Sequence, residues 1–265
     1  MLENLSLDGK TIVITGGGSG LGREMTLAMG RAGADLVVAS RRIGPIEEVA
    51  GLVRDMDRQS LAVATDVTDS AQVERLFRVA LDEFGKVDVL FNNAGIVRGR
   101  GPTPIWDVTD DEWRVGIDTN LTGSFYCSRA IAKHMAERGE GKIVNVASGF
   151  GLRGGRDNYM YTCGKGGIVQ LTRSLAISLG RYGVTSTCIV PGHVPVGETA
   201  TDPPSPNDFI PTGRGGMPSE LGPIAVFLAS AASDYMNGEM FIVDGGGLAG
   251  GYAPTGHAPK IPLVV

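Results

Sequence analysis

The chain has 265 residues, of which 42% are hydrophobic and 40 are glycine, and its formal net charge is −5 at pH 7. This length and hydrophobic content are typical of a soluble globular protein with one α/β domain around one sheet. The acidic balance argues against a nucleic-acid surface, because phosphate binding requires clustered positive charge.

The cysteines and the amino terminus indicate a cellular compartment. Cys127, Cys163 and Cys188 are odd in number and widely separated, which favours a reduced intracellular setting over a disulfide framework, and they lack metal-ligand spacing. Glu3 and Asp8 precede the first apolar run, unlike the basic start of a secretory signal, and no apolar stretch reaches membrane-spanning length. We therefore expect a cytoplasmic protein that holds no metal and binds no membrane.

The first motif is a glycine-rich turn between a strand and a helix. Residues 10–16 form a short β-branched run that predicts a buried strand. In the turn that follows, residues 15–22, backbone N–H groups at the start of a helix could approach a pyrophosphate. This order favours nucleotide binding over a plain loop. The residues expected to take part are Gly16, Ser19, Gly20, Leu21 and Gly22.

The end of the second predicted strand, residues 34–40, indicates which cofactor binds. In dinucleotide-binding folds an acidic residue here accepts hydrogen bonds from the ribose of NAD, whereas an arginine accommodates the 2′-phosphate of NADP. This chain has Ser40, Arg41 and Arg42 at that point. Serine does not repel a phosphate and arginine can hold it with two hydrogen bonds. The sequence therefore favours NADP over NAD, unless both arginines are merely solvated.

Strands and helices continue to alternate along the chain, which predicts a parallel sheet covered on both faces. The expected elements are helices ending near residues 31 and 58, strands at 61–64 and 87–91, a helix over 70–84, a helix from 109–111 towards 135, strands at 142–146 and 185–190, a helix ending near 179, a helix over 219–229 and a strand at 240–243. Asn120 is a poor helix former, so it predicts either a kink or a functional carboxamide.

Polar residues follow two of these strands. Asp66 lies where ligands collect in open α/β sheets, although Asp66, Thr68 or Asp69 could instead cap the next helix. Short polar side chains in the turn Asn92-Asn93-Ala94-Gly95 could fix that turn and touch the cofactor.

Tyr161 and Lys165 are spaced to lie one helical turn apart on the same face. A neighbouring ammonium favours the phenolate and so lowers the pKa of a tyrosine. Ser148, just past a strand, could hold a substrate oxygen while the tyrosine exchanges a proton. Taken alone, the Tyr-x-x-x-Lys spacing often arises by chance and favours an ordinary helix face.

Two segments interrupt the alternation of strands and helices. Prolines in residues 193–216 exclude a continuous helix, and the segment leaves the sheet edge where substrate would sit, so we expect a substrate lid; a passive surface loop is the alternative. The tail, residues 250–265, is rich in proline and glycine, and we expect it to fray or to dock on a neighbouring subunit.

Together these motifs resemble the classical short-chain dehydrogenase/reductase family over residues 7–247. The resemblance is carried by Thr15-Gly16-x-x-x-Gly20-x-Gly22, Asp66-Val67, Asn92-Asn93-Ala94-Gly95, Asn120, Ser148, Tyr161-x-x-x-Lys165, Pro191-Gly192 and Val243-Asp244-Gly245-Gly246. It implies a single Rossmann-type α/β domain spanning residues 1–265, with a seven-stranded parallel sheet and helices on both faces. It also implies a homotetramer, with a dimer as the alternative.

The resemblance assigns roles to individual residues. Tyr161 would be the general acid/base, Lys165 would lower its pKa and hold the nicotinamide ribose, Ser148 would position the substrate oxygen, and Asn120 would anchor a water relay through Lys165. Tyr159 competes for the acid/base role but lies off the helical face of Lys165, so we assign it to the substrate pocket or to packing. The implied cofactor contacts are Gly16, Ser19, Gly20, Leu21, Gly22, Ser40, Arg41, Asp66, Val67, Asn93, Ala94, Gly95, Tyr161, Lys165, Pro191, Gly192 and Val194.

Two positions depart from the family pattern. Val196 stands where the family commonly has a threonine that orients the nicotinamide amide, so backbone groups, Thr199 or Thr201 must supply that anchor. Gly164 stands where the family usually has serine, which we interpret as a packing change.

The sequence thus predicts an NADP-dependent oxidoreductase, with NAD as the alternative cofactor, acting on a secondary alcohol or ketone. Residues 84–88 and 113–128 look similar to sugar-acid and 3-oxoacyl reductases, and Arg153 and Arg156 could meet an anionic substrate or instead face solvent or a subunit. A nucleotide-binding regulatory protein without turnover is the alternative from another class. The glycine spacing disfavours a sugar-nucleotide epimerase or dehydratase.

Overall fold

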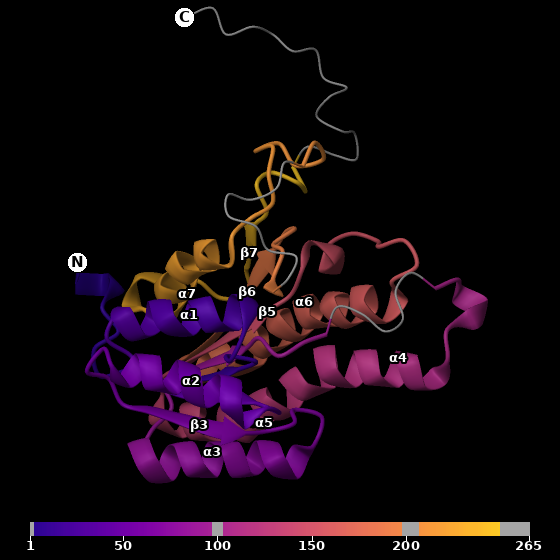
Figure 1. The fold of residues 1–265 in the computed structure, drawn as a ribbon. Coiled ribbons are helices and arrows are strands. Elements are labelled where there is room, and N and C mark those ends of the chain that lie inside the picture. The colour runs from indigo at the N-terminus through magenta and orange to yellow at the C-terminus, as the bar shows by residue number, and fades with distance from the viewer. Residues whose placement is uncertain (1–2, 97–102, 198–206, 250–265) are drawn as a thin grey trace, which may run out of the picture.

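The computed structural model describes residues 3–96, 103–197 and 207–249, and its strands form one seven-stranded sheet (Figure 1). The strand order is β3-β2-β1-β4-β5-β6-β7, and every neighbouring pair is parallel. The strands are β1 (Thr11–Thr15), β2 (Asp35–Ser40), β3 (Ser60–Ala64), β4 (Val89–Asn92), β5 (Gly141–Val146), β6 (Val184–Pro191) and β7 (Met240–Val243). The predicted single α/β domain with a seven-stranded parallel sheet is confirmed.

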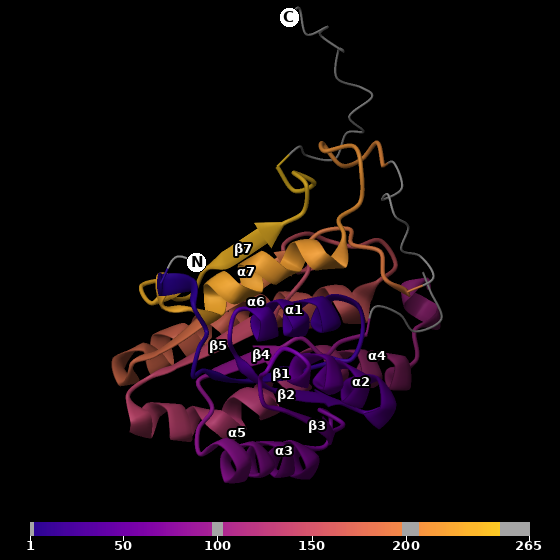
Figure 2. The ribbon, with the colours of Figure 1, turned by 60° about the vertical axis from the view of Figure 1, so that its left-hand side comes forward.

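Helices cover both faces of this sheet, as predicted. They are α1 (Gly20–Arg31), α2 (Ile43–Arg54), α3 (Ser70–Phe84), α4 (Asp110–Ile117), α5 (Gly123–Arg138), α6 (Tyr159–Leu179) and α7 (Gly222–Ala229). Helices α1, α2 and α7 pack on the face that carries Ile12 and Ile14 of β1. On the opposite face, α3 and α5 pack around Val13 and lie side by side at the bottom of Figure 2, and α6 packs on Cys188 and Val190 of β6. Because both faces are buried, the strands read as unbroken apolar runs.

The helix predicted from residue 109 is interrupted. Thr109 begins it with a capping box: its hydroxyl accepts from the N–H of Glu112, whose carboxylate accepts from the N–H of Thr109. Residues Asp118–Thr122 then form a π-helical turn before α5 continues. Asn120 lies inside this turn, so the predicted irregularity at that residue is present. Such turns are frequent at functional sites.

Some predicted boundaries were wrong by a few residues. α2 ends at Arg54 rather than near residue 58, because Asp57 adopts a left-handed backbone with φ of 58°. Residues Pro218–Leu221 form a 3₁₀ turn, and α7 begins only at Gly222. Of the three candidates for the cap of α3, Asp69 takes that role and accepts from the N–H groups of Ala71 and Gln72.

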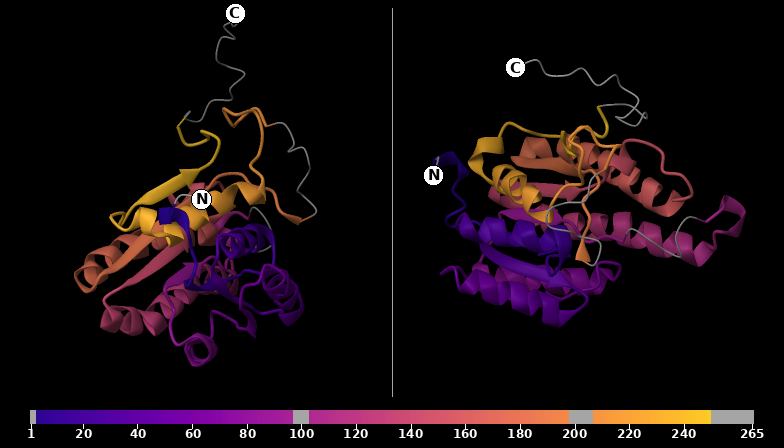
Figure 3. Two further views of the ribbon diagram at one scale, coloured as in Figure 1. Left: turned by 90° about the vertical axis from the view of Figure 1, so that its left-hand side faces the viewer. Right: turned by 45° about the horizontal axis from the view of Figure 1, so that its top comes forward.

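Irregular segments gather where the strands end. The segment 207–213, orange in Figures 1 and 2, and the yellow turn after β7 project together from the top of the molecule, and Thr212 N donates to Gly245 O at 3.2 Å. Elsewhere the amino-terminal turn Glu3–Leu5 lies against the turn Ala231–Ser233, as Figure 3 shows in indigo and yellow. The expected tail and residues 198–206 of the expected lid lie outside the described residues. None of the described helices is long and apolar enough to span a membrane.

A buried ion-pair cluster supports the amino edge of the sheet. The carboxylate of Asp88, which is 4% exposed, accepts from Thr11 N at 2.8 Å and pairs with Arg138 Nη2 at 2.7 Å and Lys86 Nζ at 3.1 Å. It thereby ties β1 and the start of β4 to the end of α5. Burial by itself would raise the pKa of Asp88, but the three donors outweigh it and hold that pKa below its usual value.

We expect Asp88→Asn to lower the free energy of unfolding by about 2 kcal/mol, because a neutral amide cannot satisfy both cations. Since the folded pKa of Asp88 is depressed, this contribution is present above the unfolded pKa of about 3.9 and is lost as the pH falls through the folded value. Denaturant titrations at a series of pH values measure both effects. In the matched control, Asp234→Asn, the carboxylate paired with Lys142 is 68% exposed, and the loss should stay below about 0.5 kcal/mol. Equal losses in the two variants would contradict the assignment.

Candidate active site

The turn between β1 and α1 depends on its glycines. Gly16 and Gly20 have φ of 67° and 53°, a backbone region that other residues rarely adopt. A Cβ on Gly22 would lie 2.1 Å from the carbonyl oxygen of Gly16, so any side chain would force the turn open. Ser19 is the N-cap of α1 and makes no side-chain cap hydrogen bond. The turn therefore presents the amino end of a helix, which favours anions.

The turn after β4 holds the glycine-rich turn in place. Asn93 Nδ2 donates to Thr15 O at 3.0 Å and to Gly16 O at 3.1 Å. In return, Thr15 Oγ1 accepts from the N–H groups of Asn93 and Ala94, both at 3.1 Å. Polar groups thus fix this turn, as the sequence predicted. The hydroxyl of Thr15 was not among the predicted site residues, and its place at the last position of a strand was the available signal.

A cleft of about 730 Å³ extends from the glycine-rich turn along the carboxyl edge of the sheet. The predicted cofactor residues that line it are Gly16, Ser19, Ser40, Arg41, Asp66, Val67, Ala94 and Gly95. Lining residues that the sequence did not single out are Pro45, Thr65, Ile96, Val115, Asp118 and Thr119. Val115 and Thr119 are four residues apart, which places them on one face of a helix, and Thr119 directly precedes Asn120; this spacing could have revealed them.

The remaining predicted cofactor residues are not among those that line this cleft. Leu21 and Val194 pack against the core, and Gly192 N donates to Val243 O at 2.9 Å. Val196, the departure from the family pattern, covers the glycine-rich turn: its Cγ1 lies 3.2 Å from where a Cβ on Gly20 would be. Thr199 and Thr201, the alternative anchors, lie outside the described residues.

Ser148 and Tyr161 meet beside the cleft. Ser148 lies just beyond the end of β5 as the N-cap of a short 3₁₀ turn, Gly149–Gly151, and its Oγ accepts from Phe150 N at 3.3 Å. Its hydroxyl also lies close to the phenol of Tyr161 on α6 and lowers the pKa of that phenol. The ring of Phe150 packs edge-on against the ring of Tyr161, with 6.3 Å between centroids. Sequence reasoning missed Phe150.

Lys165 lies one turn further along α6, and its Nζ is 5.8 Å from the centroid of the Tyr161 ring. The side chain is buried, and Nζ donates to Val146 O at 2.7 Å. Burial lowers the pKa of Lys165 to about 8, because desolvation disfavours the ammonium. The lysine nevertheless stays mostly protonated at neutral pH.

Asn120 completes the cluster from the π-helical turn. Its Nδ2 donates to Ile96 O at 3.0 Å and to Gly116 O at 2.9 Å, and its Oδ1 accepts from Ile96 N at 3.0 Å. A Cβ on Gly95 would lie 2.8 Å from Asn120 Oδ1 and 3.2 Å from Lys165 Nζ, so the carboxamide and the ammonium flank the same backbone. The four predicted catalytic side chains therefore gather in one place.

One electrostatic expectation is not met. The sequence predicted that Lys165 lowers the pKa of Tyr161, but in the structure burial raises this pKa and the hydrogen bond from Ser148 only partly offsets the rise. The ammonium of Lys165 is directed to the carbonyl of Val146 instead of the phenol oxygen. Desolvation outweighs the effect of Ser148 because the phenol is partly buried between α6 and the turn after β5.

Other residues singled out near the tyrosine are placed as follows. Tyr159 donates from its hydroxyl to Asp157 Oδ1 at 3.3 Å, which supports a packing role for it. Arg153 and Arg156 are both exposed, and the guanidinium of Arg153 lies over the ring of Phe150, 5.2 Å from its centroid. A Cβ on Gly164 would lie 2.9 Å from the Cβ of Asn120, so glycine lets α6 approach the π-helical turn.

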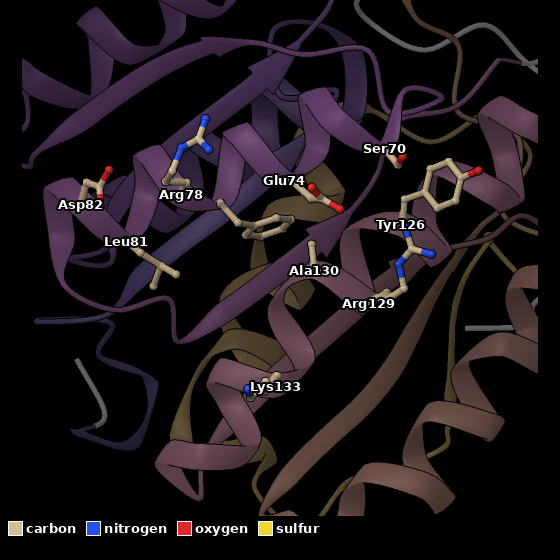
Figure 4. Close-up of a pocket in the computed structure, with 10 residues that line it drawn as sticks. Ser70, Glu74, Arg78, Leu81, Asp82, Tyr126, Arg129, Ala130 and Lys133 are labelled. Carbon is tan, nitrogen blue, oxygen red and sulfur yellow. The ribbon is translucent and has the colours of Figure 1, made fainter.

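A second groove, of about 510 Å³, lies between α3 and α5 (Figure 4). Its rim mixes the acidic Glu74 and Asp82 with the basic Arg78, Arg129 and Lys133. None of the predicted site residues lines this groove, so we place the candidate active site at the carboxyl edge of the sheet. In the described part of the chain, no cluster of three or more His, Cys, Asp and Glu residues could hold a metal ion.

Known proteins resemble this chain in sequence and in fold. The family model for short chain dehydrogenases matches residues 10–204. The chain is 37% identical over 257 residues to the 2-dehydro-3-deoxy-D-gluconate 5-dehydrogenase of Escherichia coli, covering 94% of this chain and 99% of that protein. It is 33% identical over 245 residues to a 3-oxoacyl-[acyl-carrier-protein] reductase of Synechocystis, covering 91% and 98%.

A solved structure is similar over nearly the whole chain. The gluconate 5-dehydrogenase of Burkholderia cenocepacia, in complex with NADP and tartrate, has a TM-score of 0.85 and 32% identity, covering 94% of this chain and 98% of its own. The family model and the similarity to this structure over nearly the whole chain agree with the α/β fold described above. The chain therefore belongs to the short chain dehydrogenase family and is an oxidoreductase of that family.

Proposed function

We propose that this oxidoreductase transfers hydride between NADP and a secondary alcohol or ketone, with Tyr161 as general acid/base. The observation that carries the proposal is that the hydroxyl of Ser148 lies close to the phenol of Tyr161 and lowers its pKa, beside the buried ammonium of Lys165. These groups lie next to the turns that form the dinucleotide-sized cleft. NAD is the alternative cofactor.

The residues of the cleft fit a dinucleotide. Its volume of about 730 Å³ lies within the usual range of cofactor pockets, roughly 300–1,000 Å³. The glycines of the turn leave the amino end of α1 open to a pyrophosphate. Ser40 and the exposed Arg41 line the far end, where they would hold a 2′-phosphate, and Lys165 would hold the nicotinamide ribose. The NADP bound to the Burkholderia relative supports this choice of cofactor.

Residues of the protein carry out the proton transfer in this proposal. The cofactor supplies or accepts the hydride when it is bound. In reduction, Tyr161 donates its phenolic proton to the carbonyl oxygen, and Ser148 donates a hydrogen bond to the same oxygen as negative charge develops there. The raised pKa of Tyr161 keeps the phenol protonated, which is the form that reduction requires. In our proposal, a water relay anchored near Asn120 resupplies the proton through Lys165.

We propose a sugar acid or a 3-oxoacyl compound as substrate, as in the relatives named for such compounds. Arg153 supports an anionic substrate, because its guanidinium is held on Phe150, whose ring packs on Tyr161. The segment 193–216 is proposed to act as the substrate lid.

A homotetramer, or alternatively a dimer, is also proposed. Its support is the exposure of large apolar side chains on the outer helices and the edge strand, namely Phe125, Ile177 and Ile242. The cytoplasmic location expected from the sequence stays a prediction.

We expect Tyr161→Phe to lower kcat by roughly 10²- to 10⁴-fold, because the variant loses the proton donor. Its affinity for NADP should stay close to that of the wild type. Turnover is followed by nicotinamide absorbance with a panel of ketones, sugar acids and 3-oxoacyl compounds. Tyr159→Phe is the matched control and should retain activity. Activity retained by Tyr161→Phe would refute the role of this tyrosine, and a wild type that turns over no substrate would favour the regulatory alternative.

A second variant uses the pH dependence. Because the hydrogen bond from Ser148 lowers the pKa of Tyr161, we expect Ser148→Ala to raise that pKa. Alcohol oxidation needs the phenolate, so its rate increases with pH through the pKa of Tyr161, and Ser148→Ala should move this increase to higher pH. Profiles of kcat/KM against pH measure the shift. Ser174 is exposed on α6, the helix that carries Tyr161, and Ser174→Ala is the control that should leave the profile unchanged. An unmoved profile in Ser148→Ala would contradict the proposed contact.

The cofactor preference rests on Arg41. We expect Arg41→Ala to weaken NADP binding by roughly 10- to 100-fold, because charge-assisted hydrogen bonds to the 2′-phosphate contribute about 1.5–3 kcal/mol. Binding of NAD, which lacks that phosphate, should change little. Fluorescence titration with both reduced cofactors measures the two affinities. Arg78→Ala removes the same charge from the groove between α3 and α5 and should change neither affinity; equal losses for both cofactors in Arg41→Ala would refute the preference.

A further inference from the structure

Buried polar side chains link the strands and helices that carry the candidate catalytic residues. Asn92 Nδ2 on β4 donates to Asn145 Oδ1 on β5 at 2.9 Å, and to Ser128 Oγ on α5 at 3.0 Å. Asn145 Nδ2 in turn donates to Thr172 Oγ1 on α6 at 2.9 Å. These four side chains are at most 2% exposed. A continuous hydrogen-bonded chain therefore crosses the core from β4 to α6.

Such a chain is costly to bury. Each polar group must exchange hydrogen bonds to water for bonds inside the protein, and apolar residues of the same size would pack without that cost. Asn92 Oδ1 is buried without any hydrogen-bond partner. Thr172 is fully committed, because its hydroxyl accepts from Asn145 and donates to Ile168 O at 2.8 Å. Stability alone is therefore a poor explanation for these residues.

The positions of Asn145 and Thr172 indicate what the chain of bonds does. Asn145 lies three residues before Ser148, on the strand that leads to it. Thr172 lies seven residues after Lys165, two turns along the same face of α6. The bond between Nζ of Lys165 and the carbonyl of Val146 is a second connection between the same two elements. Two cross-links at different levels thus fix how far α6 can slide along β5.

The thiol of Cys188 is a further polar group close to Lys165. Cys188 on β6 donates from its Sγ to Ile189 O at 3.5 Å, and it lies close enough to Lys165 to interact with its charge. Burial raises the pKa of Cys188 to about 11, so the thiol stays neutral at physiological pH. A neutral thiol gives the ammonium no ion-pair partner, and the position of Lys165 therefore depends on the carbonyl of Val146 and on the register of α6.

We propose that Asn145 and Thr172 are positioning residues that set the register of α6 against β5 and thereby hold the Tyr161 hydroxyl against Ser148. The proposal rests on the proposed function for the meaning of that contact. A shift of α6 by a fraction of a turn would separate the two hydroxyls, since Ser148 is fixed to the end of β5 and Tyr161 to the helix. Misplacement by about 1 Å can cost roughly 10²-fold in rate.

Two substitutions of Thr172 distinguish a role in setting the register of α6 from a role in packing alone. Thr172→Val keeps the shape and removes the hydroxyl, whereas Thr172→Ser keeps the hydroxyl and loses a buried methyl group. We expect Thr172→Val to lower kcat by roughly tenfold or more at unchanged NADP affinity. Thr172→Ser should retain kcat within about twofold of the wild type even where its Tm is lower. If kcat simply follows Tm in both variants, the residue only packs and the proposal is overturned.

A spectroscopic readout does not require turnover. Ser148 faces Tyr161 from the turn after β5 and Lys165 faces it along α6, so loss of the contact with Ser148 should raise the pKa of Tyr161. The ultraviolet absorbance of tyrosinate, with Tyr161→Phe as the blank, should therefore appear at higher pH in Thr172→Val and at the wild-type pH in Thr172→Ser. An unmoved midpoint in Thr172→Val would overturn the positioning role. A shifted midpoint in a protein without any turnover would uphold it and reject the hydride-transfer function alone.

Discussion

The buried ammonium of Lys165 is the constraint around which the site is arranged. It is 4% exposed and donates to the carbonyl of Val146, with no ion pair among the described residues. A charge in this position is tolerated only because it is hydrogen-bonded, and the cost appears as a pKa lowered to about 8. Everything that touches the ammonium must therefore be small, neutral and accurately placed.

Glycines meet the requirement for small neighbours. Three segments come close to Lys165 or to Asn120 beside it, and each does so at a glycine. A Cβ on Gly95 would lie 3.2 Å from Lys165 Nζ, one on Gly151 would lie 2.6 Å from Lys165 O, and one on Gly164 would lie 2.9 Å from Asn120 Cβ. Some of the glycines outside the phosphate-binding turn are thus explained by close packing of backbone at Lys165 and Asn120.

The sheet and the pairing of Tyr161 with Lys165 could be predicted because they depend on local patterns, whereas the grouping of Asn120 and Ser148 with them was implied by the family resemblance. Strands buried on both faces read as apolar runs, and a spacing of four residues places Tyr161 and Lys165 on one helical face. The direction of the pKa shift of Tyr161 could not, because it depends on how deeply α6 packs against the turn after β5. The role of Thr15 and the linked side chains of Asn92, Asn145 and Thr172 were missed for the same reason: each bond joins residues at least 27 positions apart.

The site thus separates into two parts with different physical origins. The elements that carry Lys165 and Ser148 are fixed from inside the core, by hydrogen bonds that connect β4, β5 and α6. The substrate side is formed by irregular chain, in which Thr212 pairs with the turn at Gly245 and Val196 covers Gly20. Irregular segments can change in sequence without disturbing the core. That division is consistent with relatives of the same fold being named for compounds as different as 2-dehydro-3-deoxy-D-gluconate and a 3-oxoacyl-[acyl-carrier-protein], and it explains why the sequence indicates where the site lies but does not identify the substrate.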